Sequence, residues 1–272
     1  MRVTMSDVAR AAQVNKATVS RVLRGDARIS PGTAEKVWAA IKELGYRPDA
    51  IARGLSSSRS DTVGVFLEDI SLPWAAEYLA GLERVLSRHG VDIILRATGG
   101  DPQQRYNALS GLLSRRVDGF ILFDNGPAPE ADIPSVIVGP KREGGHTVSV
   151  DLGSAASQLA RLADGRAVEL FQGENPFFPG IGALQPGGAP RKEGTVRLFD
   201  GRLPQEEGTS PDDTVVISAT RRCPAVPPGA WKLYWPAFEL GTLSARLLLN
   251  IIQGKGVRPQ VVSVLPALSG PL

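Results

Sequence analysis

The change of hydrophobic rhythm near residue 60 constrains the fold of this chain more than any other feature. Beyond it, short apolar runs alternate with segments whose apolar residues recur at helical spacing, from Thr62 to Val138. Because successive parallel strands need a crossover connection, this alternation predicts a parallel sheet with helices on both faces. Before residue 46 only helical spacing occurs, which predicts a small all-helical domain. A chain of 272 residues has room for both domains.

The second region is expected to be an α/β domain. In its first half, strands are predicted at 62–67, 91–95, 119–123 and 135–138, with helices at 74–89 and 102–114. After residue 150 the signal weakens, and helices are predicted at 152–163 and 241–253, with short strands at 196–199, 215–218 and 261–265. A segment rich in Gly and Pro occupies residues 173–194.

Three short helices are predicted in the first 45 residues. The predicted N-caps are Thr4, Asn15 and Ser30, and the predicted C-cap is Gly45. Asp7 follows Thr4 at the spacing of a capping box, and Pro31 follows Ser30 at the first helical position. The third helix is expected to bury an apolar stripe of Val37, Trp38, Ile41 and Leu44.

The first two helices have the spacing of a helix-turn-helix unit. Ala9 supplies the small residue needed where the helices cross, and apolar residues that hold the second helix are Val8, Ala12, Val14, Val19 and Val22. This arrangement lays the second helix in the major groove of DNA. Its exposed surface would carry Lys16, Ala17, Thr18, Ser20 and Arg21. Two cations and two hydroxyls suit phosphates and guanine edges, although a plain helical bundle would share the same core.

The charge of the chain is uneven. Residues 1–60 hold 11 Lys and Arg against 5 Asp and Glu, a net of +6, whereas the whole chain has a net charge of +3. A basic domain on a mildly acidic body suggests that the first domain binds a polyanion. Small helical domains also vary in charge, so this observation alone does not select nucleic acid.

Residues 7–23, 37–48 and 52–55 closely resemble the headpiece of the LacI/GalR family of bacterial transcription repressors. The sequence departs from the family pattern at Gln13, where the family often has glycine, and at Asn15, where serine is usual. Asn is an equally good N-cap, whereas Gln13 costs stability if the turn needs a positive φ.

The resemblance implies a role for each candidate residue of the headpiece. Lys16 and Ala17 would be the operator-specificity pair, and Arg21 would contact a base, with guanine favoured. The hydroxyl residues Thr4, Thr18 and Ser20 would hold phosphates. Residues 49–55 would match the hinge helix, whose Leu55 would wedge into the minor groove and kink the operator. Without the resemblance, Leu55 would be taken as an apolar residue at the end of a linker.

The rest of the chain resembles the periplasmic-binding-protein-like core of the same family. The expected organisation is a helix-turn-helix DNA-binding domain at 1–48, a hinge and linker at 49–60, and an α/β effector-binding and dimerisation core at 61–272. The core is shorter than that of the family, so its second subdomain is expected to be trimmed. Residues that grip a sugar in the family have no convincing match, and Gly139 stands where an acid often follows a strand.

Two residues remain as candidates for an effector site. Asp69 follows the first predicted strand, and Trp74 begins the next helix. An aromatic ring and a carboxylate can stack on and hydrogen-bond a polyol. Packing between subdomains is the alternative role for Trp74.

Catalytic and metal-binding patterns are missing from the sequence. It contains no nucleophile elbow, P-loop or zinc-protease motif, and its one cysteine and two histidines leave little for a metal site. The chain is therefore expected not to be an enzyme and to need no cofactor or metal. No apolar run reaches the length of a membrane span and no secretory signal is evident, so a cytoplasmic location is expected.

The sequence thus predicts an all-α headpiece joined to an α/β core with parallel sheets, acting as a repressor. Two headpieces of a homodimer would bind a pseudo-palindromic DNA operator. The alternative is a small-molecule binding protein whose regulatory role does not depend on the headpiece. Whether the core senses a sugar-like effector or is only a dimerisation body stays open at this point.

Overall fold

A computed structural model describes residues 3–23, 25–46, 59–123, 133–139, 144–171, 194–200, 213–218 and 228–270. The chain divides into two compact units, Met1–Ser60 and Asp61–Leu272. No helix of the described residues is both long and apolar enough to cross a membrane.

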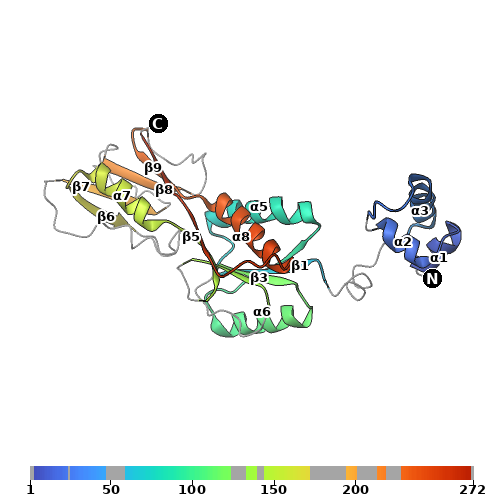
Figure 1. Ribbon diagram of the computed structural model, residues 1–272. Coiled ribbons are helices and arrows are strands. Elements are labelled where there is room, and N and C mark those ends of the chain that lie inside the picture. The colour runs from blue at the N-terminus through green and yellow to red at the C-terminus, as the bar shows by residue number, and fades with distance from the viewer. Residues whose placement is uncertain are drawn as a thin grey trace. The chain divides into compact units, whose positions relative to one another are not determined.

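The first unit contains the three helices that the sequence predicts (Figure 1). They are α1 (Met5–Ala11), α2 (Lys16–Leu23) and α3 (Pro31–Leu44). Ser30 caps α3 through a bond from the Thr33 N–H, and Gly45 ends it in the left-handed region at φ 60°. The core between the helices consists of Val8, Ala9, Ala12, Val19, Val22, Val37, Ala40 and Tyr46.

Trp38 does not belong to this core, and that part of the predicted stripe is wrong. Its side chain is 51% exposed, whereas Val37 is fully buried. Successive residues of a helix point about 100° apart, so only one of these two neighbours can face the other helices. The buried positions of α3 are Val37 and Ala40, with Ile41 and Leu44 packed beside them.

The second unit opens with a six-stranded sheet whose strand pairs are all parallel, as predicted. Its order is β10-β5-β4-β3-β1-β2. The strands are β1 (Thr62–Leu67), β2 (Asp92–Ala97), β3 (Gly119–Phe123), β4 (Ser135–Val138), β5 (His146–Val150) and β10 (Val261–Val264). The sequence did not predict β5, which is short and lies directly after a Gly pair.

Helices cover both faces of this sheet (Figure 1). One face packs against α5 (Pro73–Leu86) and α8 (Ala237–Ile252), and the other against α6 (Pro102–Ser114). A short 3₁₀ turn, Ser87–His89, follows α5. The alternation of buried side chains along β1 and β3 explains the two layers, since their odd and even residues face opposite helices.

Two glycines let α5 and α8 cross with their backbones in contact. A Cβ at Gly81 would overlap the carbonyl oxygen of Phe238, and a Cβ at Gly241 would overlap that of Tyr78. Each helix therefore has one glycine at the point where the backbone of the other helix approaches most closely. The crossing fixes α8 on the sheet although the two helices lie about 160 residues apart in sequence.

The second sheet has the order β11-β9-β8-β7-β6. Its strands are β6 (Ala167–Phe171), β7 (Thr195–Asp200), β8 (Thr214–Ser218), β9 (Trp231–Tyr234) and β11 (Ala267–Ser269), and α7 (Leu152–Ala163) packs on it. The pair of β11 and β9 is antiparallel. The other strand pairs of this sheet are parallel, as expected, and its antiparallel edge strand β11 follows directly after β10, which lies in the first sheet.

At three places in its described part the chain passes from one sheet to the other. It leaves the first sheet after β5, returns between β9 and α8, and leaves again between β10 and β11. Gln158 of α7 holds the segment between β10 and β11 in place. Its side chain donates to the Pro266 carbonyl at 3.0 Å and accepts from the Leu268 N–H at 2.9 Å.

Candidate nucleic-acid interface

The start of α2 is set by Asn15. Its Oδ1 accepts the backbone N–H of Thr18 at 2.7 Å and the Thr18 hydroxyl at 2.9 Å. An N-cap of this kind satisfies donors that the first turn of a helix leaves unpaired. The N-terminal end of α2 is thereby held in a defined position.

The turn between α1 and α2 needs a left-handed residue, and Gln13 supplies it at φ 54°. The N–H of Val14 then donates to the Ala9 carbonyl at 3.0 Å, which closes the turn. Val19 and Val22 are buried on the side of α2 that faces α1. The opposite side of α2 is consequently left for a partner.

That outer side of α2 is cationic. Lys16, Ala17 and Arg21 are exposed, and Thr18 and Ser20 are half-buried. The first turn of α2 has no acidic residue. Neither cation forms an ion pair with another residue of the described part of the chain. Helical spacing brings these five positions onto one surface, which suits a polyanion.

Thr4 has a structural task. Its hydroxyl donates to Asp7 Oδ2 at 2.7 Å and accepts the Asp7 N–H at 3.4 Å, and its own N–H donates to Asp7 Oδ2 at 2.9 Å. This is the predicted capping box, and it lowers the pKa of Asp7. Because the single hydroxyl proton is used within the cap, a phosphate contact from Thr4 would require that proton to turn away from Asp7.

Sequence reasoning overlooked one charged pair close to α2. Asp26 and Arg28 lie in the loop after the helix and form an ion pair, with 2.7 Å between Asp26 Oδ2 and Arg28 Nη2. The local signal is a glycine followed by Asp and, two residues later, Arg. Such a run is typical of a turn, so on its own it gave no reason to expect a binding role.

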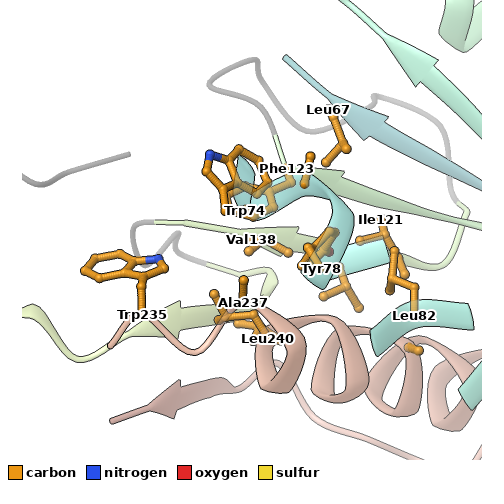
Figure 2. Packing of buried hydrophobic residues seen from close by; sticks show 14 of the residues in the cluster. Leu67, Trp74, Tyr78, Leu82, Ile121, Phe123, Val138, Trp235, Ala237 and Leu240 are labelled. Carbon is orange, nitrogen blue, oxygen red and sulfur yellow. The ribbon is translucent and has the colours of Figure 1, made fainter. Parts of the chain in front are cut away.

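The two candidate effector-binding residues, Trp74 and Asp69, differ in burial and in the contacts that they make. Trp74 is only 2% exposed, and its ring packs against Phe123 at a centroid distance of 4.3 Å and against Tyr78 at 6.3 Å (Figure 2). Both contacts come from α5 and β3, so the ring packs in the core on one face of the first sheet, whereas the alternative role expected for it was packing between subdomains. Asp69 is half-buried, and the Ser71 N–H donates to its Oδ1 at 2.7 Å, which lowers the pKa of this carboxyl.

Four buried side-chain atoms have no hydrogen-bond partner in the described part of the chain, and two of them, Trp74 Nε1 and the Tyr78 hydroxyl oxygen, belong to this aromatic cluster. Burying an unpaired donor costs free energy. The described residues contain no group of acids, histidines or cysteines able to hold a metal ion. Leu55, the residue expected to enter the minor groove, lies outside the described residues.

A helix-turn-helix unit followed by an α/β unit of two sheets is the architecture of a helical headpiece joined to a periplasmic-binding-protein-like core. Residues 4–49 match the family model for bacterial regulatory proteins of the lacI family. Residues 60–139 match the model for periplasmic binding proteins and the sugar binding domain of the LacI family. These two segments of the chain therefore match LacI-family models, which confirms the resemblance seen in the sequence over residues 4–49 and 60–139.

Curated relatives include the catabolite control protein A of Staphylococcus xylosus. The two are 39% identical over 168 residues, which is 58% of this chain and 51% of that protein. The protein of the same name from Priestia megaterium is 40% identical over 140 residues, 52% of this chain and 42% of its own length. The chain thus spans about half the length of the curated relatives it matches.

Solved structures share the fold over nearly the whole chain. The Lac repressor dimer bound to operator and the anti-inducer ONPF has a TM-score of 0.76 at 18% identity, covering 100% of this chain and 98% of that one. The complex of the transcriptional regulator CelR with cellobiose has a TM-score of 0.61 at 23% identity, covering 99% of each chain.

Proposed function

We propose that this protein is a sequence-specific DNA-binding regulator that represses transcription as a homodimer on a pseudo-palindromic operator. The observation that supports this most is the outer surface of α2. It carries two exposed cations that form no ion pair within the described part of the chain, while the other side of the helix is fixed by the helix-turn-helix core. Nothing in a stable three-helix bundle requires cations to gather there, whereas a polyanion partner does.

Within this proposal, the residues of α2 divide into two groups. Lys16 and Ala17 open the helix and face base edges, where they set operator preference, and Arg21 pairs with a guanine. Thr18 and Ser20 hold phosphates. Ser20 is the readier donor, because the Thr18 hydroxyl proton already bonds to Asn15.

The remaining roles rest on the resemblance to the LacI family. Thr4 would contact a phosphate once its hydroxyl leaves the capping box. Leu55 would insert into the minor groove at the centre of the operator, where an apolar wedge unstacks a base step and bends the duplex. A twofold dimer places two headpieces on half-sites one helical turn or a multiple apart, so the operator should be an inverted repeat.

The core is the basis for a second candidate function, the binding of a small molecule. A relative in fold, CelR, is seen with cellobiose, and the Trp74 Nε1–H lacks a partner in the described part of the chain. An acceptor on a ligand would satisfy that donor. Asp69 and Trp74 are the proposed contacts, and the effector would be sugar-like.

Selection of DNA by the full chain tests the main proposal. The protein is incubated with a random pool of duplexes, and bound duplexes are amplified and sequenced over several rounds. We expect enrichment of one inverted repeat, bound as a dimer by sedimentation. Enrichment of no sequence, with all duplexes bound equally or not at all, would overturn the proposal of a sequence-specific regulator.

A further inference from the structure

The loop after α2 has a shape fixed by backbone hydrogen bonds. Gly25 lies at φ 70°. Its N–H donates to the Val22 carbonyl at 3.0 Å, and the Asp26 N–H donates to the Arg21 carbonyl at 3.1 Å. These two bonds form a Schellman motif, which places Asp26 directly beyond the last turn of the helix. The Ile29 N–H then donates to the Asp26 carbonyl at 3.0 Å and closes a β-turn.

Both carboxylate oxygens of Asp26 bind Arg28. Oδ1 accepts from the Arg28 backbone N–H at 3.1 Å and from its Nε–H at 2.9 Å, and Oδ2 accepts from Nη2–H at 2.7 Å. Hydrogen bonds from Arg28 hold the pKa of Asp26 well below its usual range, and the charge of Arg21 lowers it further. Asp26 is therefore ionised at neutral pH and remains so in more acidic solution than an ordinary aspartate.

Local stability explains only part of this arrangement. Asp is favoured at the first position of such a turn, where one oxygen accepts a backbone N–H. The turn does not need the second oxygen to grip the guanidinium. A carboxylate just beyond a helix C-terminus is also disfavoured by the helix dipole. Neither the turn nor α2 therefore requires the contact between the guanidinium and the second carboxylate oxygen.

The pair leaves one edge of the Arg28 guanidinium pointing outward. The Arg28 side chain is 83% exposed, whereas that of Asp26 is 18% exposed. A guanidinium carries five N–H donors. Asp26 occupies two of them, and the other three have no partner in the described part of the chain. Two of those three lie on the edge formed by Nη1 and Nη2, which matches the oxygens of a phosphate.

We propose that Arg28 is a DNA-phosphate contact of the headpiece and that Asp26 is its positioning residue. This inference rests on the proposed DNA-binding function. In the helix-turn-helix geometry the N-terminal residues of the second helix face base edges. Arg28 lies beyond the opposite end, so it meets the DNA backbone. A free arginine loses rotamer freedom when it binds, and Asp26 removes that freedom before DNA arrives.

Binding of the full chain to two duplexes tests this inference. One duplex carries the inverted repeat enriched from the random pool, and the other is an unselected sequence of equal length. Arg28→Ala should weaken binding to both about equally, by roughly tenfold, because a phosphate contact carries no sequence information. The slope of log affinity against log salt should fall by about 0.9.

Substitution of Asp26 gives the sharper test, because a pure charge effect and a positioning effect predict changes of DNA affinity in opposite directions. Removing a carboxylate should strengthen DNA binding if only net charge matters. We expect Asp26→Ala to weaken it about threefold in the wild-type background and to strengthen it in the Arg28→Ala background. Asp26→Asn keeps an acceptor for the Arg28 N–H, and so the turn, and should behave like Asp26→Ala. Glu35→Ala, which removes an exposed carboxylate from α3, is the matched control and should only strengthen binding.

Three results would overturn the inference. Stronger binding of Asp26→Ala and Asp26→Asn in both backgrounds would make Asp26 a plain anion near DNA. A larger loss for Arg28→Ala on the selected duplex would make Arg28 a base contact. An unchanged affinity of Arg28→Ala beside a wild-type chain that binds normally would remove Arg28 from the interface. A wild-type chain that binds neither duplex would instead refute the proposed function, and this inference with it.

Discussion

Arg21 is the residue whose substitution separates reading of a base from attraction to phosphate. Its guanidinium is exposed on α2, and a bidentate pair with guanine is worth about 1–3 kcal/mol of discrimination. Arg21→Ala should weaken binding to the selected duplex by about tenfold or more and flatten the preference at one position of each half-site. Competition binding against duplexes changed at single positions measures this. Lys42→Ala, which removes an exposed cation from α3, is the control, and an equal loss on unselected DNA would show a phosphate contact only.

Gln13 stores strain that a glycine would release. It occupies the left-handed region at φ 54°, which costs an L-residue about 1 kcal/mol relative to glycine. Gln13→Gly should raise the stability of the first unit by about 0.5–1 kcal/mol, and Gln13→Ala should give no such gain. Hydrogen exchange of the amides of α1, α2 and α3 in the full chain measures it. Unchanged exchange in Gln13→Gly would mean that the turn tolerates glutamine without strain.

At the scale of single residues, the sequence predicts the helix N-caps well, but it predicts less well which side chains face the core. Thr4, Asn15 and Ser30 cap helices as predicted, because a cap depends on residues only three positions away. Trp38 was assigned to the core by its size and spacing, but its neighbour Val37 occupies the buried position. Arg28 was overlooked because its partner and its orientation follow from a turn that only the fold defines.

At the scale of elements, amphipathic helices and continuous apolar strands were the predictable ones. The bounds predicted for α6, α7, β1, β3 and β4 agree with the structure. The sequence missed β5, β6, β9 and β11. Length does not separate the two groups of strands, because β3 and β4 are equally short but are runs of almost wholly buried apolar residues. The missed strands mix polar with apolar residues, so their existence depends on the neighbour with which each one pairs.

The crossing of α5 and α8 carries a prediction at the same scale. A Cβ at Gly241 would overlap the Tyr78 carbonyl oxygen, a backbone atom that cannot turn away. Gly241→Ala should therefore destabilise the second unit by about 1–3 kcal/mol. Gly111→Ala in α6 is the matched control, since nothing lies within 4 Å of its Cβ, and it should stabilise by about 0.5–1 kcal/mol. Chemical denaturation of the full chain compares them, and similar stabilities would contradict the close crossing.

At the scale of the whole molecule, the order of strands could not be obtained from the sequence. The alternation after residue 62 predicts one layered parallel sheet, and the first sheet confirms it. The chain in fact forms two sheets, and the residues of β9 and β10 do not indicate which sheet each strand joins. That choice depends on contacts between distant segments, such as Gln158 with Pro266 and Gly81 with Phe238. Periodicity is a local property and does not record such contacts.

Recognition of an effector also belongs to the whole molecule, because it would need groups from several elements at once. From the resemblance, we expect no convincing match in this sequence to the groups that fix sugar hydroxyls in the family. Gly139 directly follows β4, at the position where the family often has an acidic residue, and it has no side chain to bind a ligand. Its backbone N–H already donates to the Val148 carbonyl at 3.0 Å. The ring of Trp74 is packed against Phe123 and Tyr78, so it has little face left for stacking on a sugar.

We therefore expect simple monosaccharides to bind the full chain weakly, with dissociation constants near or above 1 mM (about −4 kcal/mol), and operator binding to need no corepressor. A buried hydroxyl left unpaired costs about 1–3 kcal/mol, which would cancel the gain from burying a sugar. Calorimetry with glucose, ribose, cellobiose and adenosine measures binding, and DNA affinity is measured with and without each compound. The indole N–H resonance of Trp74, assigned with Trp74→Phe, reports whether this donor, which has no acceptor among the described residues, gains one from a ligand. A micromolar constant that shifts this resonance and changes DNA affinity would show that the core has built a different effector pocket.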